Sequence, residues 1–200
     1  WERVGKCGMV DVTLAQLTQV TALSTFIAMK RVKTCTELPM WSEWLQVAIY
    51  VATMNQEARL SEGDTIPFQL VYHALGYIEA AAKHESQHSI LLESKVINAL
   101  DYACVNDFYS EQIQVGLASN AAGAAVALLG RNEGGKTLSR ETVATVLGSV
   151  SICFQPDHFL RHRPIPYVLN VFGRVVTMCI SDANKRLVLE HDGLVALLLD

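Results

Sequence analysis

Two short segments of this 200-residue chain recur almost a hundred residues further on. Ile66-Pro67-Phe68 returns as Ile165-Pro166-Tyr167, at an offset of 165 − 66 = 99. Ile90-Leu91-Leu92-Glu93 returns as Leu187-Val188-Leu189-Glu190, at an offset of 187 − 90 = 97. Half of this offset, about 48 residues, predicts an intermediate copy of a repeating unit. A chain of such repeats folds by stacking similar units, because one unit cannot bury its apolar face alone.

The repeating unit is predicted to contain a long helix, a polar loop, a short helix, a corner and a second helix. Apolar residues at helical spacing predict three long helices, over 67–82, 111–129 and 165–180. The intermediate copy of the short helix is degenerate. Its expected residues Leu138 and Glu141 stand where the register of Ile90 and Glu93 places them. The chain is therefore expected to be all-α, with units of about 48 residues.

The last unit carries the clearest pattern. From Asn184 a short amphipathic run leads to a polar break that ends at Gly193, and a Leu-rich run follows to Leu199. This pattern predicts two helices that meet at a glycine corner. It resembles the first two helices of an armadillo repeat, in which an Asn precedes helix 1. Residues 85–103 are similar, although Ser94-Lys95 replaces the glycine.

The armadillo resemblance implies a right-handed α-solenoid, and the closely related HEAT repeats remain an alternative. We expect a single domain over 1–200, in which 1–60 is a cap or a set of degenerate repeats. A helix is predicted over 13–30, and Trp41 and Trp44 lie one turn apart on a second helix, as core residues. Because the chain lacks an initiator Met and stops within an apolar run, we expect a fragment of a longer protein.

Composition argues against several classes of protein. Half of the residues are apolar and 18% are charged, which predicts a packed core rather than disorder. A net charge of −4 provides no basic footprint for nucleic acid. No apolar run reaches the length of about 18 residues that a membrane span requires, and no signal peptide is visible. Five scattered cysteines without a C-x-x-C motif predict reduced thiols in the cytoplasm.

One segment matches the pattern of a phosphate-binding P-loop. Gly130, Gly135, Lys136 and Thr137 occupy the positions at which such a loop cradles phosphates and binds magnesium. However, the Ala-rich run over 121–127 favours a helix rather than the β-strand that precedes a P-loop. The repeat register also places this segment in a loop between units. Nucleotide binding is therefore the alternative hypothesis.

A second segment, His84-Glu85-Ser86-Gln87-His88, matches the H-E-x-x-H pattern of zinc hydrolases. That site needs both histidines on one face of a helix and a third ligand. The repeat register instead places His84 in a loop and His88 at the start of a short helix, and no supporting motif supplies a third ligand. We therefore predict neither a metal site nor a cofactor, and keep zinc hydrolysis as the less favoured alternative.

The leading hypothesis is a non-catalytic scaffold that binds another protein. The armadillo resemblance implies that the long helices line a concave surface for partner segments. The polar and aromatic candidates on these helices are Tyr72, His73, Asn120, Asn170 and Arg174. Tyr72 and Asn120 are 120 − 72 = 48 residues apart, so we expect them in one column. The three long helices contain no tryptophan, which argues against the tryptophan arrays of the family's nuclear-import receptors.

Overall fold

The computed structural model describes residues 45–53, 68–105, 111–132, 135–154 and 165–191. Within these ranges the regular elements are all helical, which confirms the all-α prediction. They comprise a helix over 45–53, α3 (Phe68–Ala82), the 3₁₀ turn η3 (Glu85–Gln87), α4 (His88–Glu93), α5 (Val96–Val105), α6 (Glu111–Leu129), α7 (Arg140–Phe154), α8 (Ile165–Met178) and α9 (Asp182–Leu189). The predicted helix over 13–30, Trp41, Trp44 and the corner at Gly193 lie outside the described residues.

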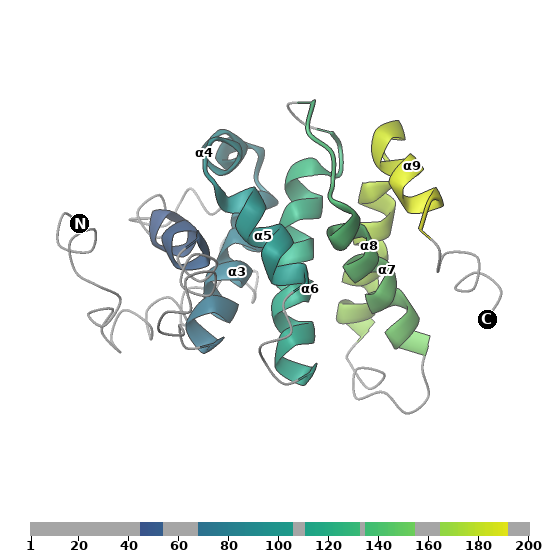
Figure 1. Cartoon of the computed structure of the whole chain (residues 1–200), viewed down its shortest axis with the longest axis horizontal. Coiled ribbons are helices and arrows are strands. Elements are labelled where there is room, and N and C mark those ends of the chain that lie inside the picture. Colours follow the sequence, from purple (N-terminus) through teal and green to yellow (C-terminus); the bar gives the residue numbers. More distant parts are fainter. Residues whose placement is uncertain (1–44, 54–67, 106–110, 133–134, 155–164, 192–200) are drawn as a thin grey trace.

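The three predicted long helices are present as α3, α6 and α8, and α8 ends two residues earlier than expected. They form one layer in chain order, with α6 packed between α3 and α8 (Figure 1). The second layer contains α5 and α7, which contact each other and pack on α6. The short helix α4 packs on α5, while α9 packs on α7 and α8. The core lies between the two layers.

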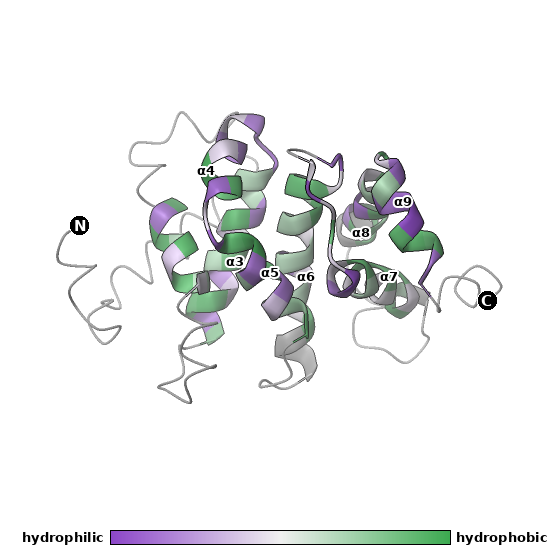
Figure 2. Ribbon diagram, turned by 45° about the horizontal axis from the view of Figure 1, so that its top comes forward, coloured by the Kyte–Doolittle hydropathy of each residue, from purple (hydrophilic) through white to green (hydrophobic). Residues whose placement is uncertain are grey.

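Helix α6 occupies the centre because its side chains are small. Ala121, Ala122, Ala124 and Ala125 are each at most 1% exposed, although they face different sides of the helix. A helix that is apolar all round is one that is packed on all sides. Figure 2 shows α6 in white to green along most of its described length. Among the described helices, none is both long enough and apolar enough to cross a membrane.

The corner between α4 and α5 forms without glycine, because Ser94 ends one helix and begins the other. Its backbone is extended (φ −80°, ψ 165°), which stops α4. Its hydroxyl donates to the Leu91 carbonyl at 2.8 Å and accepts from the Val96 amide at 3.3 Å. Serine thus satisfies a carbonyl at the end of α4 and an amide at the start of α5.

The intermediate unit differs from the prediction. Residues 136–139 are not helical, so Leu138 lies in a loop and Glu141 in the first turn of α7. A counterpart of α4 was expected here, and that expectation is wrong for the described residues. Ser139 instead starts α7 directly, because its hydroxyl accepts a hydrogen bond from the Thr142 amide at 3.1 Å.

Asn184 was expected before the first helix of the last unit, but it lies inside the first turn of α9, which begins at Asp182. Its side chain is fully buried. The amide nitrogen donates to the Leu129 carbonyl at 2.7 Å and the Gly130 carbonyl at 3.0 Å, both at the end of α6. The amide oxygen accepts from the Leu138 backbone amide at 3.0 Å. Asn184 therefore joins α9 to the end of α6 and to the following loop.

Candidate partner-binding surface

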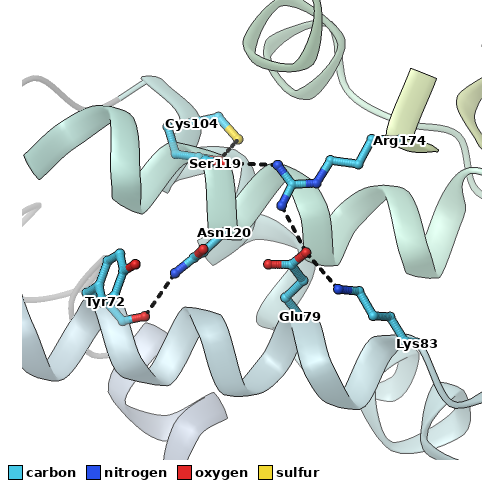
Figure 3. A network of polar contacts seen from close by, with 8 residues as sticks. Tyr72, Glu79, Lys83, Cys104, Ser119, Asn120 and Arg174 are labelled. Carbon is cyan, nitrogen blue, oxygen red and sulfur yellow. Dashed lines mark hydrogen bonds and ion pairs between the residues drawn. The ribbon is translucent and has the colours of Figure 1, made fainter. Parts of the chain in front are cut away.

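The first two long helices approach each other at glycine. A Cβ atom added to Gly76 of α3 would lie 3.3 Å from the Asn120 amide nitrogen of α6. The same nitrogen donates to the backbone carbonyl of Tyr72 at 3.3 Å (Figure 3). In turn, a Cβ added to Gly116 would lie 3.2 Å from the Tyr72 ring. Residues later in α3 contact residues later in α6, so the two helices run parallel.

The second interface, between α6 and α8, also contains a glycine and a polar side chain. A Cβ added to Gly123 of α6 would lie 2.5 Å from Nη2 of Arg174 and 2.6 Å from Oε1 of Glu79. Arg174 extends from α8 across α6 and donates to Glu79 on α3 at 2.9 Å and to Ser119 at 2.9 Å (Figure 3). Because Gly123 has no side chain, one ion pair connects all three long helices.

This ion pair is buried, since the two side chains are 8% and 10% exposed. Burial alone would raise the pKa of Glu79. The charges and hydrogen bonds of Arg174 and Lys83 outweigh that effect and lower the pKa of Glu79 below its ordinary value. Lys83 lies 3.1 Å from the same carboxylate oxygen. The carboxylate is therefore ionised at neutral pH and accepts from two cations, which compensates for its burial.

The glycine contacts at the two interfaces define which positions of the long helices are equivalent. Gly76 and Gly123 each receive a polar side chain from the next long helix. Their separation is 123 − 76 = 47, and Gly173 follows at 173 − 123 = 50. The sum of 97 equals an offset that the sequence contains independently. Gly173 of α8 thus occupies the third position of the series, and nothing lies within 4 Å of a Cβ placed there.

The same alignment places His73, Asn120 and Asn170 at equivalent positions, 47 and 50 residues apart. Asn170 is exposed, while His73 and Asn120 are half-buried. The rings of His73 and Tyr72 meet edge to face, with centroids 5.4 Å apart. Burial lowers the pKa of His73 below 6.5, so its imidazole is mainly neutral at neutral pH. In this alignment the three positions belong to one column, with one position on each long helix.

The two remaining candidates, Tyr72 and Arg174, differ in their exposure and in what they contact. Tyr72 is 40% exposed and contacts Asn120, but through its backbone carbonyl rather than as the equivalent residue. Arg174 is only 7% exposed and engaged with Glu79 and Ser119. The expectation that Arg174 lies on the partner-binding surface is therefore wrong. A strongly hydrogen-bonded, buried guanidinium holds helices together and is unavailable to a partner.

The described residues of the glycine-rich loop do not have the strand-to-helix surroundings of a P-loop. A P-loop joins a strand to a helix, whereas this segment follows α6 and leads to α7. Lys136 donates to the backbone carbonyl of Leu92 at 3.1 Å, at the end of α4. Gly135 has a φ of 74°, which requires glycine for conformational reasons alone. The described residues of this loop thus connect two parts of the helical stack.

The two histidines of the zinc motif lie on different elements. His84 has an extended backbone before η3, and His88 begins α4. Nε2 of His88 is 2.7 Å from the Ala82 carbonyl, inside the protein. Among the described residues, no three His, Cys, Asp or Glu side chains form a group suited to a metal ion. The local geometry therefore follows the repeat register rather than the H-E-x-x-H pattern.

Sequence reasoning missed two features of the long-helix layer. The first is the connection of Glu79, Gly123 and Arg174, which only the packing reveals. The second is an apolar face on α8, where Leu169, Phe172, Val176 and the following Ile180 are exposed. The spacing of glycines by 47 and 50 residues was a signal in the sequence that could have revealed the alignment. Comparisons with protein-family models, curated proteins and solved structures found no match.

Proposed function

We propose that this protein is a non-catalytic helical-repeat scaffold of the armadillo-like α-solenoid type, which binds another protein in the cytoplasm. The observation that carries this proposal is that both interfaces between successive long helices are built at a glycine of the earlier helix. Gly76 receives Asn120, and Gly123 receives Arg174, each from the next long helix. Repeated interfaces of this kind produce an extended surface, and extended surfaces are what helical-repeat proteins use to bind partners.

The proposed binding surface is the column of His73, Asn120 and Asn170. The residues that follow these on their helices include the half-buried Ala80 and Ala127, whose side chains are small. Such positions let a partner backbone come close, while the amide of Asn170 can both donate to it and accept from it. We infer an extended segment of another protein as the ligand on this column.

The proposal is tested with surface variants that are matched in chemistry. Asn170→Ala removes an exposed amide from α8, and Asn98→Ala removes an exposed amide from α5, in the other layer. A partner is first identified by quantitative mass spectrometry of proteins retained by the wild-type chain. Its affinity is then measured by calorimetry with purified components. Asn170→Ala combined with His73→Ala should weaken binding at least tenfold, and Asn98→Ala should leave it unchanged.

Three outcomes would contradict this function. A partner bound equally by all three proteins would mean that the His73–Asn120–Asn170 column is not the binding surface. Heat of ATP binding that is lost in Lys136→Ala would favour the nucleotide alternative. Stoichiometric zinc in the purified protein that is lost in His88→Ala would favour the hydrolase alternative.

A further inference from the structure

The outer face of α8 carries several exposed apolar side chains in the described part of the chain. Its exposed side chains are Leu169 (65%), Phe172 (38%), Val176 (67%) and, just beyond the helix, Ile180 (51%). Their spacing of three to four residues keeps them on one side of the helix. Gly173 lies among them, and a Cβ added there would meet nothing within 4 Å. Single exposed apolar residues are ordinary, but a continuous group on one helix marks an interaction surface.

The equivalent faces of α3 and α6 each pack against the next long helix. With the glycine alignment, Leu169 corresponds to Ser119 and Tyr72, Val176 to Val126 and Glu79, and Ile180 to Gly130 and Lys83. Ser119 and Val126 are buried on α6. Ser119 contacts Arg174 of α8, and a Cβ added to Gly130 would lie 2.9 Å from Thr177 of α8. On α3, the same face contacts α6 through Tyr72, whose backbone carbonyl accepts from Asn120, and through Glu79, which lies against Gly123.

We propose that the outer face of α8 is a docking surface for an amphipathic α-helix of a partner protein. The argument is continuity with two interfaces already present, since each earlier copy of this face packs against a parallel helix. This inference rests on the proposed scaffold function and assigns to it a second kind of bound segment, an amphipathic helix. The docked helix runs parallel to α8 and crosses it at Gly173, where the missing side chain permits close approach.

The chemistry of this face also determines the chemistry of the helix that binds it. On α3 the equivalent positions include Glu79 and Lys83, so the covering helices supply a polar group, Arg174. On α8 these positions are Val176 and Ile180, which offer no charge. The contacting side of the docked helix must therefore be apolar, because a charge placed there would be buried without a partner. Asn170, at the edge of the α8 face, can bind a polar group on the rim of the docked helix.

The test begins with a photo-crosslinking phenylalanine derivative in place of Val176 in the full chain. Crosslinked peptides are identified by mass spectrometry, and the captured segment is synthesised. We expect a segment with an apolar stripe at helical spacing that gains helical circular dichroism on binding. Gly173→Leu and Val176→Asp should each weaken its binding at least tenfold. A Cβ added at Gly173 meets nothing within 4 Å and Val176 is largely exposed, so we expect both variants to fold.

The control is Val105→Asp, which alters an equally exposed valine on α5 and should leave binding unchanged. Capture of an extended segment, of a second copy of this chain, or of nothing would overturn the inference. Concentration-dependent dimerisation in sedimentation velocity that Val176→Asp abolishes would assign the face to a second copy. If partner binding depends on His73 and Asn170 but not on Gly173 or Val176, the scaffold function stands and the α8 docking surface is wrong.

Discussion

At the scale of single residues, the connection of Glu79 with Arg174 matters most, because it links three helices through one ion pair. Both side chains are about nine-tenths buried. Loss of one partner leaves a buried charge whose desolvation is no longer compensated, and such losses destabilise by about 3–5 kcal/mol. Lys83 remains 3.1 Å from Glu79 and reduces this effect.

We expect Arg174→Met to lower the free energy of unfolding at pH 7 by about 3 kcal/mol, measured by urea denaturation. Met preserves much of the side-chain length and removes the charge and donors. The control is Lys185→Met, which breaks an exposed ion pair with Asp182 and should leave stability unchanged within error. Equal stability of Arg174→Met and the wild type would show that the buried ion pair contributes nothing.

The pKa of Glu79 also predicts a pH dependence. Its folded-state pKa is lowered from the ordinary 4.5, so the folded state favours the ionised form. The resulting stability is fully present above 4.5 and is lost as pH falls through the lower, folded-state pKa. The stability difference between wild type and Glu79→Gln should be constant from neutral pH to just above 4.5 and shrink below it. A difference that grows on acidification would reverse the assigned direction.

Glycines in similar helices are predicted to respond in opposite directions. In Gly173→Ala the added methyl group meets nothing, so higher helix propensity should stabilise by about 0.5–1 kcal/mol. In Gly123→Ala the added methyl group displaces Arg174 and Glu79, and the free energy of unfolding should fall by about 1–3 kcal/mol. Thermal unfolding measures both, with Gly148→Ala of α7 as a second open position. Stabilisation by Gly123→Ala would contradict the close packing there.

At the scale of elements, Asn184 determines how α9 sits on the layer beneath it. It satisfies two carbonyls at the end of α6 and one amide in the next loop, all in the protein interior. Helix ends leave such carbonyls without intrahelical partners. The sequence pattern suggested that Asn184 precedes a helix. The residue instead caps the end of a different helix, α6.

We expect Asn184→Ala to destabilise the protein by about 3 kcal/mol, because three backbone groups lose buried partners. Asn184→Asp should be at least as harmful, since a carboxylate accepts from Leu138 but cannot donate to the two carbonyls of α6. Chemical denaturation measures both variants. Lys185→Ala, at the exposed neighbouring position, serves as the control. Wild-type stability in Asn184→Ala would indicate that water satisfies these groups instead.

At the scale of the whole molecule, stability should be distributed according to position in the stack. Helix α6 packs against α3, α5, α7 and α8, whereas α9 packs on the edge formed by α7 and α8 and reaches the end of α6 through Asn184. Segments with few buried contacts open locally at low free energy. Repeat proteins therefore open more easily at their edges than in the middle.

Hydrogen exchange followed by mass spectrometry tests this gradient. Backbone amides of α6 should exchange slowest and those of α9 fastest among the described helices. Asn184→Ala should accelerate exchange in α9 more than in α3, because it releases α9 from the end of α6. Uniform exchange across α6 and α9 would mean that the described part of the chain unfolds as one cooperative unit.

The sequence by itself determined where the three long helices lie and roughly where they begin. Apolar residues at helical spacing specify a buried face without reference to any neighbour, so α3, α6 and α8 agree with expectation. It also predicted that His84 and His88 lie on different elements. These properties depend on residues close together in the chain.

The tertiary structure alone decided which side chains meet. Arg174 is a reasonable surface candidate in the sequence, and only the approach of α8 to α6 at Gly123 buries it beside Glu79, 95 residues earlier in the chain. The lack of an α4 counterpart among the described residues after α6, and the role of Asn184, depend in the same way on the neighbouring helices. Contacts between distant segments depend on packing, which local periodicity does not encode.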